Sequence, residues 1–232
     1  MASVQAQNDV NVEHVIIDGS SSDGTFDRIS KSCRENDIFI SEPDNGIYDA
    51  LNKGFQHATG DILGILHSDD QFADQNVLSD IEHQFLQHSS DVSYGNVELG
   101  KFHMDDQFQI VREFRSGEFS GTLGYGWMPA HPALFFKKSV WERIGPFKQN
   151  LKVSADYEWM VRLFLDTSLK KVFFDRVTTR MSLGGQSTDG FASERLKFFE
   201  DYKVIKQHKL PIFTTLIFKK LRKLPQYRIR RT

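Results

Sequence analysis

The sequence predicts an α/β fold in which a mostly parallel sheet is flanked by helices. Three observations support this: strand-like and helix-like segments alternate over the first 70 residues, their connections are short, and turn-forming residues mark the boundaries. At 232 residues the chain is long enough for one generous domain or two small ones. No linker divides it cleanly, so we expect one α/β domain over residues 1–200, followed by a basic, amphipathic helical extension over residues 201–232.

Each expected element follows from a local pattern. Residues 14–19, HVIIDG, form a β-branched run closed by glycine, and residues 25–33 have helical spacing. Strands over residues 38–41 and 62–67 enclose a helix within residues 45–61. The remaining expected elements are helices over residues 77–88, 139–145 and 154–167, and strands over residues 91–99, 108–114 and 131–138.

Composition argues against secretion and against a membrane-spanning protein. A single cysteine, Cys33, cannot form an internal disulfide, so the fold does not depend on an oxidising compartment. No apolar run approaches the roughly 20 residues of a spanning helix, and residues 1–14 are too polar for a secretory signal. We therefore expect a cytoplasmic protein.

The charge distribution is asymmetric, because residues 219–232 contain seven cations and no acid. Without them the net charge of −2 would become −9. Interspersed apolar residues suit a helix lying on an anionic membrane, so we expect peripheral attachment to the inner face of the plasma membrane. Nucleic-acid binding is the alternative for the tail, but nothing else offers a basic groove, so no nucleic-acid partner is expected. A helix packed on the domain with a solvated face is the third possibility.

Carboxylates follow two of the expected strands. Asp18 ends the strand over residues 14–19, and Asp69 and Asp70 follow the strand over residues 62–67. Ligands of open parallel sheets bind at the carboxyl ends of strands, and adjacent carboxylates repel unless a cation joins them. Mg²⁺ or Mn²⁺ shared with substrate phosphates would relieve that repulsion. The alternatives are a solvated loop or helix cap for the pair, and a local turn for Asp18.

Five segments, taken in order, resemble the successive motifs of family 2 glycosyltransferases of the GT-A (Rossmann-like) fold, especially bacterial enzymes of exopolysaccharide or O-antigen synthesis. These segments are HVIIDGSSSDGT, EPDNGIYDALNKGFQHATGD, ILGILHSDD, HPALFFKKSVWERIGPF and SADYEWMVRL. The resemblance covers most of residues 3–190. It implies metal-dependent, inverting transfer of a sugar, expected from a UDP-hexose, to a saccharide or lipid-linked acceptor in surface polysaccharide or lipopolysaccharide synthesis.

The resemblance also implies roles for residues on the donor side. Asp18 matches the acid that hydrogen-bonds the base, and Asn52 with Lys53 the pair that flanks the nucleotide site. Residues 68–70, SDD, match the Asp-x-Asp position of the family. Within them, Asp69 matches the ribose contact, and Asp70 the ligand of Mn²⁺ or Mg²⁺.

On the acceptor side, Asp156 matches the catalytic base that deprotonates the attacking hydroxyl. The first turn of a helix favours the ionised form that a base needs, although a residue there can also serve only the helix dipole. His131 matches a position near the acceptor pocket, with a structural role as the alternative. Tyr157 and Glu158 are expected to shape the acceptor side.

The sequence departs from the family pattern at its start. The usual first strand and most of the first helix are missing before residues 3–7, so we expect an N-terminally truncated fold. The alternative function is therefore a catalytically silent remnant that binds a nucleotide or a partner protein. A Gln-x-x-Arg-Trp segment is absent after Asp156, which favours single additions over processive synthesis.

Overall fold

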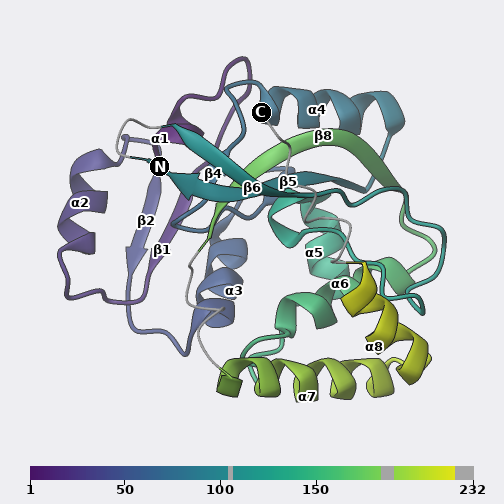
Figure 1. Ribbon diagram of the computed structural model, residues 1–232. Helices are drawn as coiled ribbons and strands as arrows, with labels where there is room; N and C mark the ends of the chain where they lie inside the picture. Colours follow the sequence, from purple (N-terminus) through teal and green to yellow (C-terminus); the bar gives the residue numbers. More distant parts are fainter. Residues whose placement is uncertain (104–106, 184–190, 223–232) are drawn as a thin grey trace.

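The computed structural model describes residues 1–103, 107–183 and 191–222, which form two sheets flanked by helices (Figure 1). Strands β1 (Val15–Asp18) and β2 (Ile38–Ser41) pair in a small sheet of their own. The larger sheet has the order β3-β7-β5-β8-β4, with β6 beside β5. Its strands are β3 (Ile62–Gly64), β4 (Gln71–Phe72), β5 (Val92–Phe102), β6 (Phe108–Phe114), β7 (Leu134–Lys137) and β8 (Lys171–Ser182).

The helices are α1 (Ala2–Gln5), α2 (Thr25–Ser32), α3 (Ile47–His57), α4 (Val77–His88), the 3-10 turn η1 (His131–Ala133), α5 (Lys138–Ile144), α6 (Ala155–Leu165), α7 (Phe191–Gln207) and α8 (Ile212–Leu221). The helices from α2 to α6 lie where local spacing and turn residues predict, whereas α1 and the start of α7 were not expected, and the first residues of the strand expected over 131–138 form a 3-10 turn.

The expectation of a mostly parallel sheet is wrong, because the large sheet is mixed. Only β1 with β2 and β5 with β8 pair in parallel among the described strands. Strand β7 runs antiparallel to both β3 and β5, and β5–β6 and β4–β8 are also antiparallel. Parallel neighbours require a crossover segment. The regular alternation of strands with helices ends after α4. From there the chain passes from β5 to β6 and β7 without an α-helical crossover between them.

The two faces of the large sheet are covered by different helices, as the alternation of Phe135 and Phe136 along β7 shows. Phe135 packs in a cluster with buried residues of α4, including Phe85. Phe136 lies on the other face, with its ring centroid 5.5 Å from Phe55 of α3 and 4.9 Å from Trp159 of α6. Figure 1 shows α4 on one side of the sheet and α5 and α6 on the other.

The C-terminal helices are part of this packed structure. The boundary expected at residue 200 falls inside α7, and α7 contributes the buried side chains of Val204 and Ile205 to the main core. Residues 223–232, which hold four of the seven cations of the tail, lie outside the described residues. Within the described residues no helix is long and apolar enough to cross a membrane.

Candidate active site

Asp156, in the first turn of α6, is linked to three aromatic side chains from other parts of the fold. Its Oδ1 lies 3.1 Å from the hydroxyl of Tyr48, which also lies 2.9 Å from the carbonyl oxygen of Val153. Its Oδ2 lies 3.3 Å from Nδ1 of His131, and Nε2 of His131 lies 2.9 Å from Nε2 of His67. Residues from α3, the loop after β3, η1 and α6 thus form one continuous polar chain.

The protonation states in this chain follow from burial and charge. Burial alone would raise the pKa of Asp156, but His131, Lys197 and a backbone hydrogen bond hold it below its ordinary value. Burial lowers the pKa of His131 despite the attraction of Asp156. Burial, with His131 beside it, lowers the pKa of His67 to about 4. At neutral pH, Asp156 is therefore ionised and both imidazoles are neutral. A hydrogen on Nδ1 of His131, facing Asp156, would leave its Nε2 to accept from Nε2–H of His67.

The loop that enters α6 is held by α7. The carboxylate of Glu200 accepts hydrogen bonds from the backbone N–H groups of Lys152, Val153 and Ser154, each at 2.9 Å. Ser154 occupies the N-cap position, but its hydroxyl donates to Asp201 at 2.9 Å instead of capping its own helix. A carboxylate from another helix therefore satisfies the backbone donors just before Asp156.

Asp70 is a buried carboxylate that lacks a hydrogen-bond partner on one oxygen. Its backbone N–H donates to the carbonyl of His67, which closes a turn after β3. The residue is 5% exposed, and its Oδ2 has no partner among the described residues. Burial, together with the neighbouring Asp69, raises the pKa of Asp70 to about 7. Asp69 itself is exposed.

A divalent cation fits this environment, because it would supply the missing partner of Oδ2 and favour the ionised carboxylate. Within the described part of the chain, no group of three or more acidic, histidine or cysteine side chains is arranged to hold a metal. Asp70 would therefore share a cation with substrate phosphates and water, which is the usual arrangement for Mg²⁺.

Asp18 lies buried at the end of β1, and its carboxylate is engaged locally. Oδ2 accepts from the backbone N–H of Ser21 at 3.0 Å and from the hydroxyl of Ser41 at 2.6 Å. These hydrogen bonds, from Ser21 and then Ser41, lower the pKa of Asp18. A Cβ atom on Gly19 would lie 2.6 Å from the Asp44 carboxylate, so glycine allows the loops after β1 and β2 to approach.

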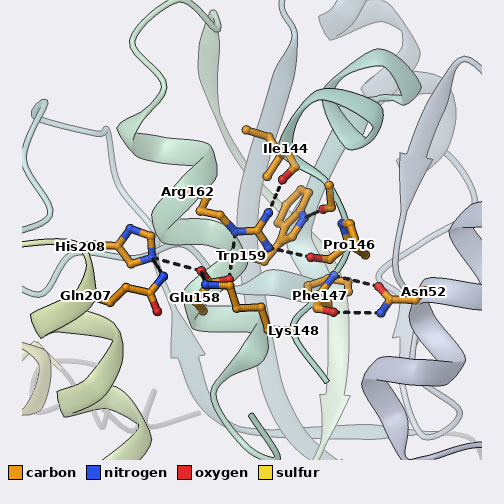
Figure 2. A network of polar contacts seen from close by, with 11 residues as sticks. Asn52, Ile144, Pro146, Phe147, Lys148, Glu158, Trp159, Arg162, Gln207 and His208 are labelled. Carbon is orange, nitrogen blue, oxygen red and sulfur yellow. Dashed lines mark hydrogen bonds and ion pairs between the residues drawn. The ribbon is translucent and has the colours of Figure 1, made fainter. Parts of the chain in front are cut away.

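Asn52 and Lys53, on α3, also bond to the protein itself. The amide of Asn52 pairs with the backbone of Phe147, accepting at 2.8 Å and donating at 3.0 Å (Figure 2). The ammonium of Lys53 lies 2.8 Å from both the Glu42 carboxylate and the carbonyl oxygen of Pro43. The two residues thus hold α3 against the segments that follow α5 and β2.

Glu158, two residues after Asp156, is the centre of a buried ion-pair network. Its carboxylate is fully buried and lies 2.7 Å from Lys148, 3.0 Å from Arg162 and 3.1 Å from His208 (Figure 2). The network joins α6 to the preceding loop and to the end of α7. Its contacts hold α6 against these neighbouring segments.

Tyr157 is buried beneath a cation from α8. The ammonium of Lys219 lies 3.3 Å from the centre of the Tyr157 ring and 2.7 Å from the Asp201 carboxylate. Burial lowers the pKa of Lys219 to about 8. Tyr157 thus links α6 to α8 through Lys219, and Lys219 in turn contacts Asp201 of α7.

The structure brings together only some of the residues that the sequence predicts for the site. Asp156 and His131 are in contact. Asp18 and Lys53, by contrast, make their contacts beside the ends of β1 and β2. The acceptor-side pair therefore forms a direct contact. The donor-side residues are divided between the small sheet, where Asp18 and Lys53 make their contacts, and the turn after β3 of the large sheet, where Asp70 lies.

Three residues of the site were missed by reasoning from the sequence: His67, Tyr48 and Glu200. His67 lies just before the SDD segment, and Tyr48 lies within one of the five motif segments. Their contacts, of His67 with His131 and of Tyr48 with Asp156, have no signal in the sequence alone. Glu200 lies in the segment expected to end the domain, and nothing in its surroundings indicates a contact with the loop before α6.

Comparisons with known proteins agree on one family. A family model described as Glycosyl transferase family 2 matches residues 1–144. An uncharacterized glycosyltransferase of Mycobacterium tuberculosis (strain CDC 1551 / Oshkosh) is 33% identical over 186 residues, which cover 79% of this chain and 66% of that protein. A PGL/p-HBAD biosynthesis glycosyltransferase of Mycobacterium bovis (strain BCG / Pasteur 1173P2) is 28% identical over 202 residues, 84% of this chain and 75% of that protein. The chain thus spans just under two thirds of the length of the first of these relatives.

Solved structures share the fold. TarS 1–349 of S. aureus in complex with UDP-GlcNAc has a TM-score of 0.68 and 17% identity, and the match covers 89% of this chain and 60% of that one. The mannosyltransferase PcManGT of Pyrobaculum calidifontis, in complex with GDP-Man and Mn²⁺, has a TM-score of 0.61 and 17% identity, covering 97% of this chain and 65% of that one. The architecture is therefore α/β and GT-A-like, and, with a family model matched over more than half of its residues, the chain belongs to glycosyl transferase family 2.

Proposed function

We propose that the chain is a metal-dependent, inverting glycosyltransferase. It moves a hexosyl group from a nucleoside diphosphate donor, expected to be a UDP-hexose, to a hydroxyl group of a saccharide or lipid-linked acceptor in surface polysaccharide synthesis. Membership of the family supports the reaction class. The observation that carries the proposal is the ionised Asp156 held by Tyr48 and His131 at the start of α6.

Asp156 acts as the general base in one displacement step. The acceptor oxygen attacks the anomeric carbon while the bond from that carbon to the diphosphate oxygen breaks, and the proton of the acceptor hydroxyl passes to Asp156. Attack from the face opposite the leaving group inverts the anomeric configuration. His131 donates to Asp156 and fixes the orientation of the carboxylate, and His67 in turn fixes the tautomer of His131.

On the donor side, Asp70 would hold Mn²⁺ or Mg²⁺, and Asp69 would contact the ribose. When bound, the cation neutralises charge that develops on the departing diphosphate. The unpartnered Oδ2 of Asp70 supports this role, and PcManGT is a relative in fold that was solved with GDP-Man and Mn²⁺. TarS, solved with UDP-GlcNAc, supports a uridine nucleotide.

The other donor-side residues act at the loops that surround the nucleotide. Asp18 contacts the base from the end of β1, where Ser21 and Ser41 keep its carboxylate ionised. Asn52 and Lys53 act indirectly, because their polar groups hold the segments after α5 and β2 in place.

On the acceptor side, His131 lies beside the base, whereas Tyr157 and Glu158 act through the packing of α6 against its neighbours. Their contacts with Lys219 and with Arg162 support positioning of α6 more directly than contact with an acceptor.

A silent nucleotide- or partner-binding remnant remains the second candidate, and one observation favours it. Strands β1 and β2, which carry Asp18, form a separate sheet, with no hydrogen-bonded strand linking them to the large sheet among the described residues. A donor site that depends on both sheets would then be held together by loops and helices, such as α3, and not by a continuous sheet.

Calorimetric titration of the folded chain with UDP, with Mn²⁺ or with EDTA, tests the proposal. We expect binding that depends on Mn²⁺ and is lost in Asp70→Asn, with GDP as the comparison nucleotide. Asp23→Asn, in the exposed loop after β1, is the matched control. A chain that is folded by circular dichroism but binds neither nucleotide contradicts the proposal and favours the remnant.

A further inference from the structure

Helices α7 and α8 enclose an apolar groove of about 520 Å³ on the outside of the molecule. Its lining includes Phe198, Phe199 and Tyr202 of α7 and Phe213, Ile217 and Lys220 of α8. Figure 1 shows the two helices at one end of the molecule, beyond α5 and α6. The groove therefore lies on a surface that neither sheet covers.

The apolar side chains of the groove face outward, whereas the opposite face of α7 is packed. Phe213 is 82% exposed, Ile217 51% and Phe199 48%. By contrast, Val204 and Ile205 of α7 are buried in the main core. Clustered exposure of large apolar side chains is uncommon on a protein surface that meets only water, and it marks an interaction site.

The helices that form the groove carry more cations than acids, and one of these cations, Lys219, is largely buried and paired with Asp201. Residues 191–222 contain eight lysines and arginines and three acids. Two of the acids, Glu200 and Asp201, are buried and engaged with the start of α6, which leaves Glu194 as the exposed acid.

Two of the cations lie over rings of the groove. The Lys220 ammonium is 5.9 Å from the centre of the Phe198 ring, and the Arg195 guanidinium is 5.6 Å from that of Phe199. Cations that border exposed aromatic side chains match the interface of an anionic bilayer, where phosphates lie just outside the acyl chains.

We propose that the surface formed by α7 and α8 docks on an anionic lipid bilayer. The phenylalanine and isoleucine side chains of the groove enter the outer part of the acyl region, and Arg195, Lys220 and their basic neighbours meet the lipid phosphates. This inference extends beyond glycosyl transfer and does not depend on it.

The docking surface is directly connected to the candidate active site. Glu200, on the inward face of α7, binds the backbone just before Asp156. A bilayer held against the outward face of α7 therefore lies one helix away from the loop that positions the base. An acceptor whose sugar is anchored in the same bilayer would reach the site from that side.

Flotation of the full chain with vesicles tests the proposal. We expect binding to vesicles of phosphatidylcholine mixed with phosphatidylglycerol, weaker binding at high salt, and little binding to phosphatidylcholine alone. The double variant Phe213→Ser/Ile217→Ser should bind at least about tenfold more weakly, because two apolar side chains no longer enter the bilayer. It keeps every lysine and arginine of the chain, so its loss of binding cannot come from charge.

The matched control is Leu86→Ser, since Leu86 is 71% exposed on α4, at the other side of the large sheet. It should bind like the wild type. The proposal is overturned if the wild type ignores anionic vesicles or if the double variant binds them as tightly as the wild type. It is also overturned if the chain elutes as a dimer that the double variant converts to a monomer while vesicle binding is unchanged, because the groove would then bind a second copy.

Discussion

Asp156 and Asp70 are two acids of the same candidate site, and their surroundings shift the pKa values of the two carboxyl groups in opposite directions. The side chain of Asp156 is 22% exposed, accepts a hydrogen bond from Tyr48, lies 3.3 Å from Nδ1 of His131 and has a lowered pKa. Asp70 is 5% exposed, has an unpartnered oxygen, and its pKa is raised to about 7. Burial acts against ionisation in both, so the partners decide the outcome. The fold thus favours the ionised form of Asp156 and the protonated form of Asp70 unless a cation binds there.

The largest effect should come from Asp156→Asn, which keeps the shape of the side chain but removes the base. We expect sugar transfer to fall by about 10²- to 10⁴-fold, the usual contribution of a general base. Release of UDP from the donor in the presence of acceptor measures the loss, while calorimetry should show UDP affinity close to that of the wild type. Turnover at the wild-type rate would remove Asp156 from the base role.

A second effect concerns the support of Asp156. Glu200→Gln replaces the carboxylate that binds three backbone N–H groups with a neutral amide. We expect the free energy of unfolding to fall by about 2–3 kcal/mol, as for buried hydrogen bonds to a charged group, and kcat to fall with it. Urea denaturation measures the change, and Glu194→Gln, at an exposed site of the same helix, is the control. Equal stability of the two variants would show that Glu200 does not hold α6.

Asp70→Asn should raise the free energy of unfolding, whereas Glu200→Gln lowers it. The folded-state pKa of Asp70 lies above its ordinary value of 3.8, so the ionised carboxylate destabilises the metal-free protein increasingly as pH rises from about 4 to about 7. We expect the variant to be about 2 kcal/mol more stable than the wild type at pH 8 in EDTA, and to lose any stabilisation by Mn²⁺. Urea midpoints at pH 5 and pH 8 measure this, with Asp61→Asn, at an exposed site just before β3, as the control. A less stable variant at pH 8 would mean that the Asp70 carboxylate is fully partnered in the folded protein.

The smallest expected effect is on the pH dependence of stability. The pKa of His131 is lowered in the folded state, where it faces Asp156, Lys197 and His67, so the unfolded chain takes up its proton first as pH falls below the ordinary value of 6.5. The free energy of unfolding should therefore decrease on acidification from pH 7 to pH 5. His131→Asn should reduce this decrease by on the order of 1 kcal/mol, whereas His83→Asn, at an exposed site of α4, should not. An identical slope in both variants would contradict the assigned neutral state of His131.

Local elements were well predicted because their signals are local. The strand at residues 38–41 and the helix over residues 77–88 have the expected bounds, and apolar spacing with flanking turn residues is enough to define them. Strands β4 and β8 were not expected. Strand β4 has only two residues, and β8 mixes charged, aromatic and β-branched residues without clear alternation. Strand β8 pairs with both β4 and β5, and this pairing stabilises the two strands in a way that their local sequences do not indicate.

The sequence by itself determined most of the elements between β1 and α6, the family resemblance and the places where carboxylates follow strands, because each of these is a property of neighbouring residues. The direction of the strands after α4 and the surroundings of each carboxylate were decided only by the tertiary structure. Tyr48 is 108 residues from Asp156, and Glu200 is 48 residues from Lys152. Contacts over such separations depend on how the whole chain packs, and they decide which acid has a lowered pKa and which has a raised one.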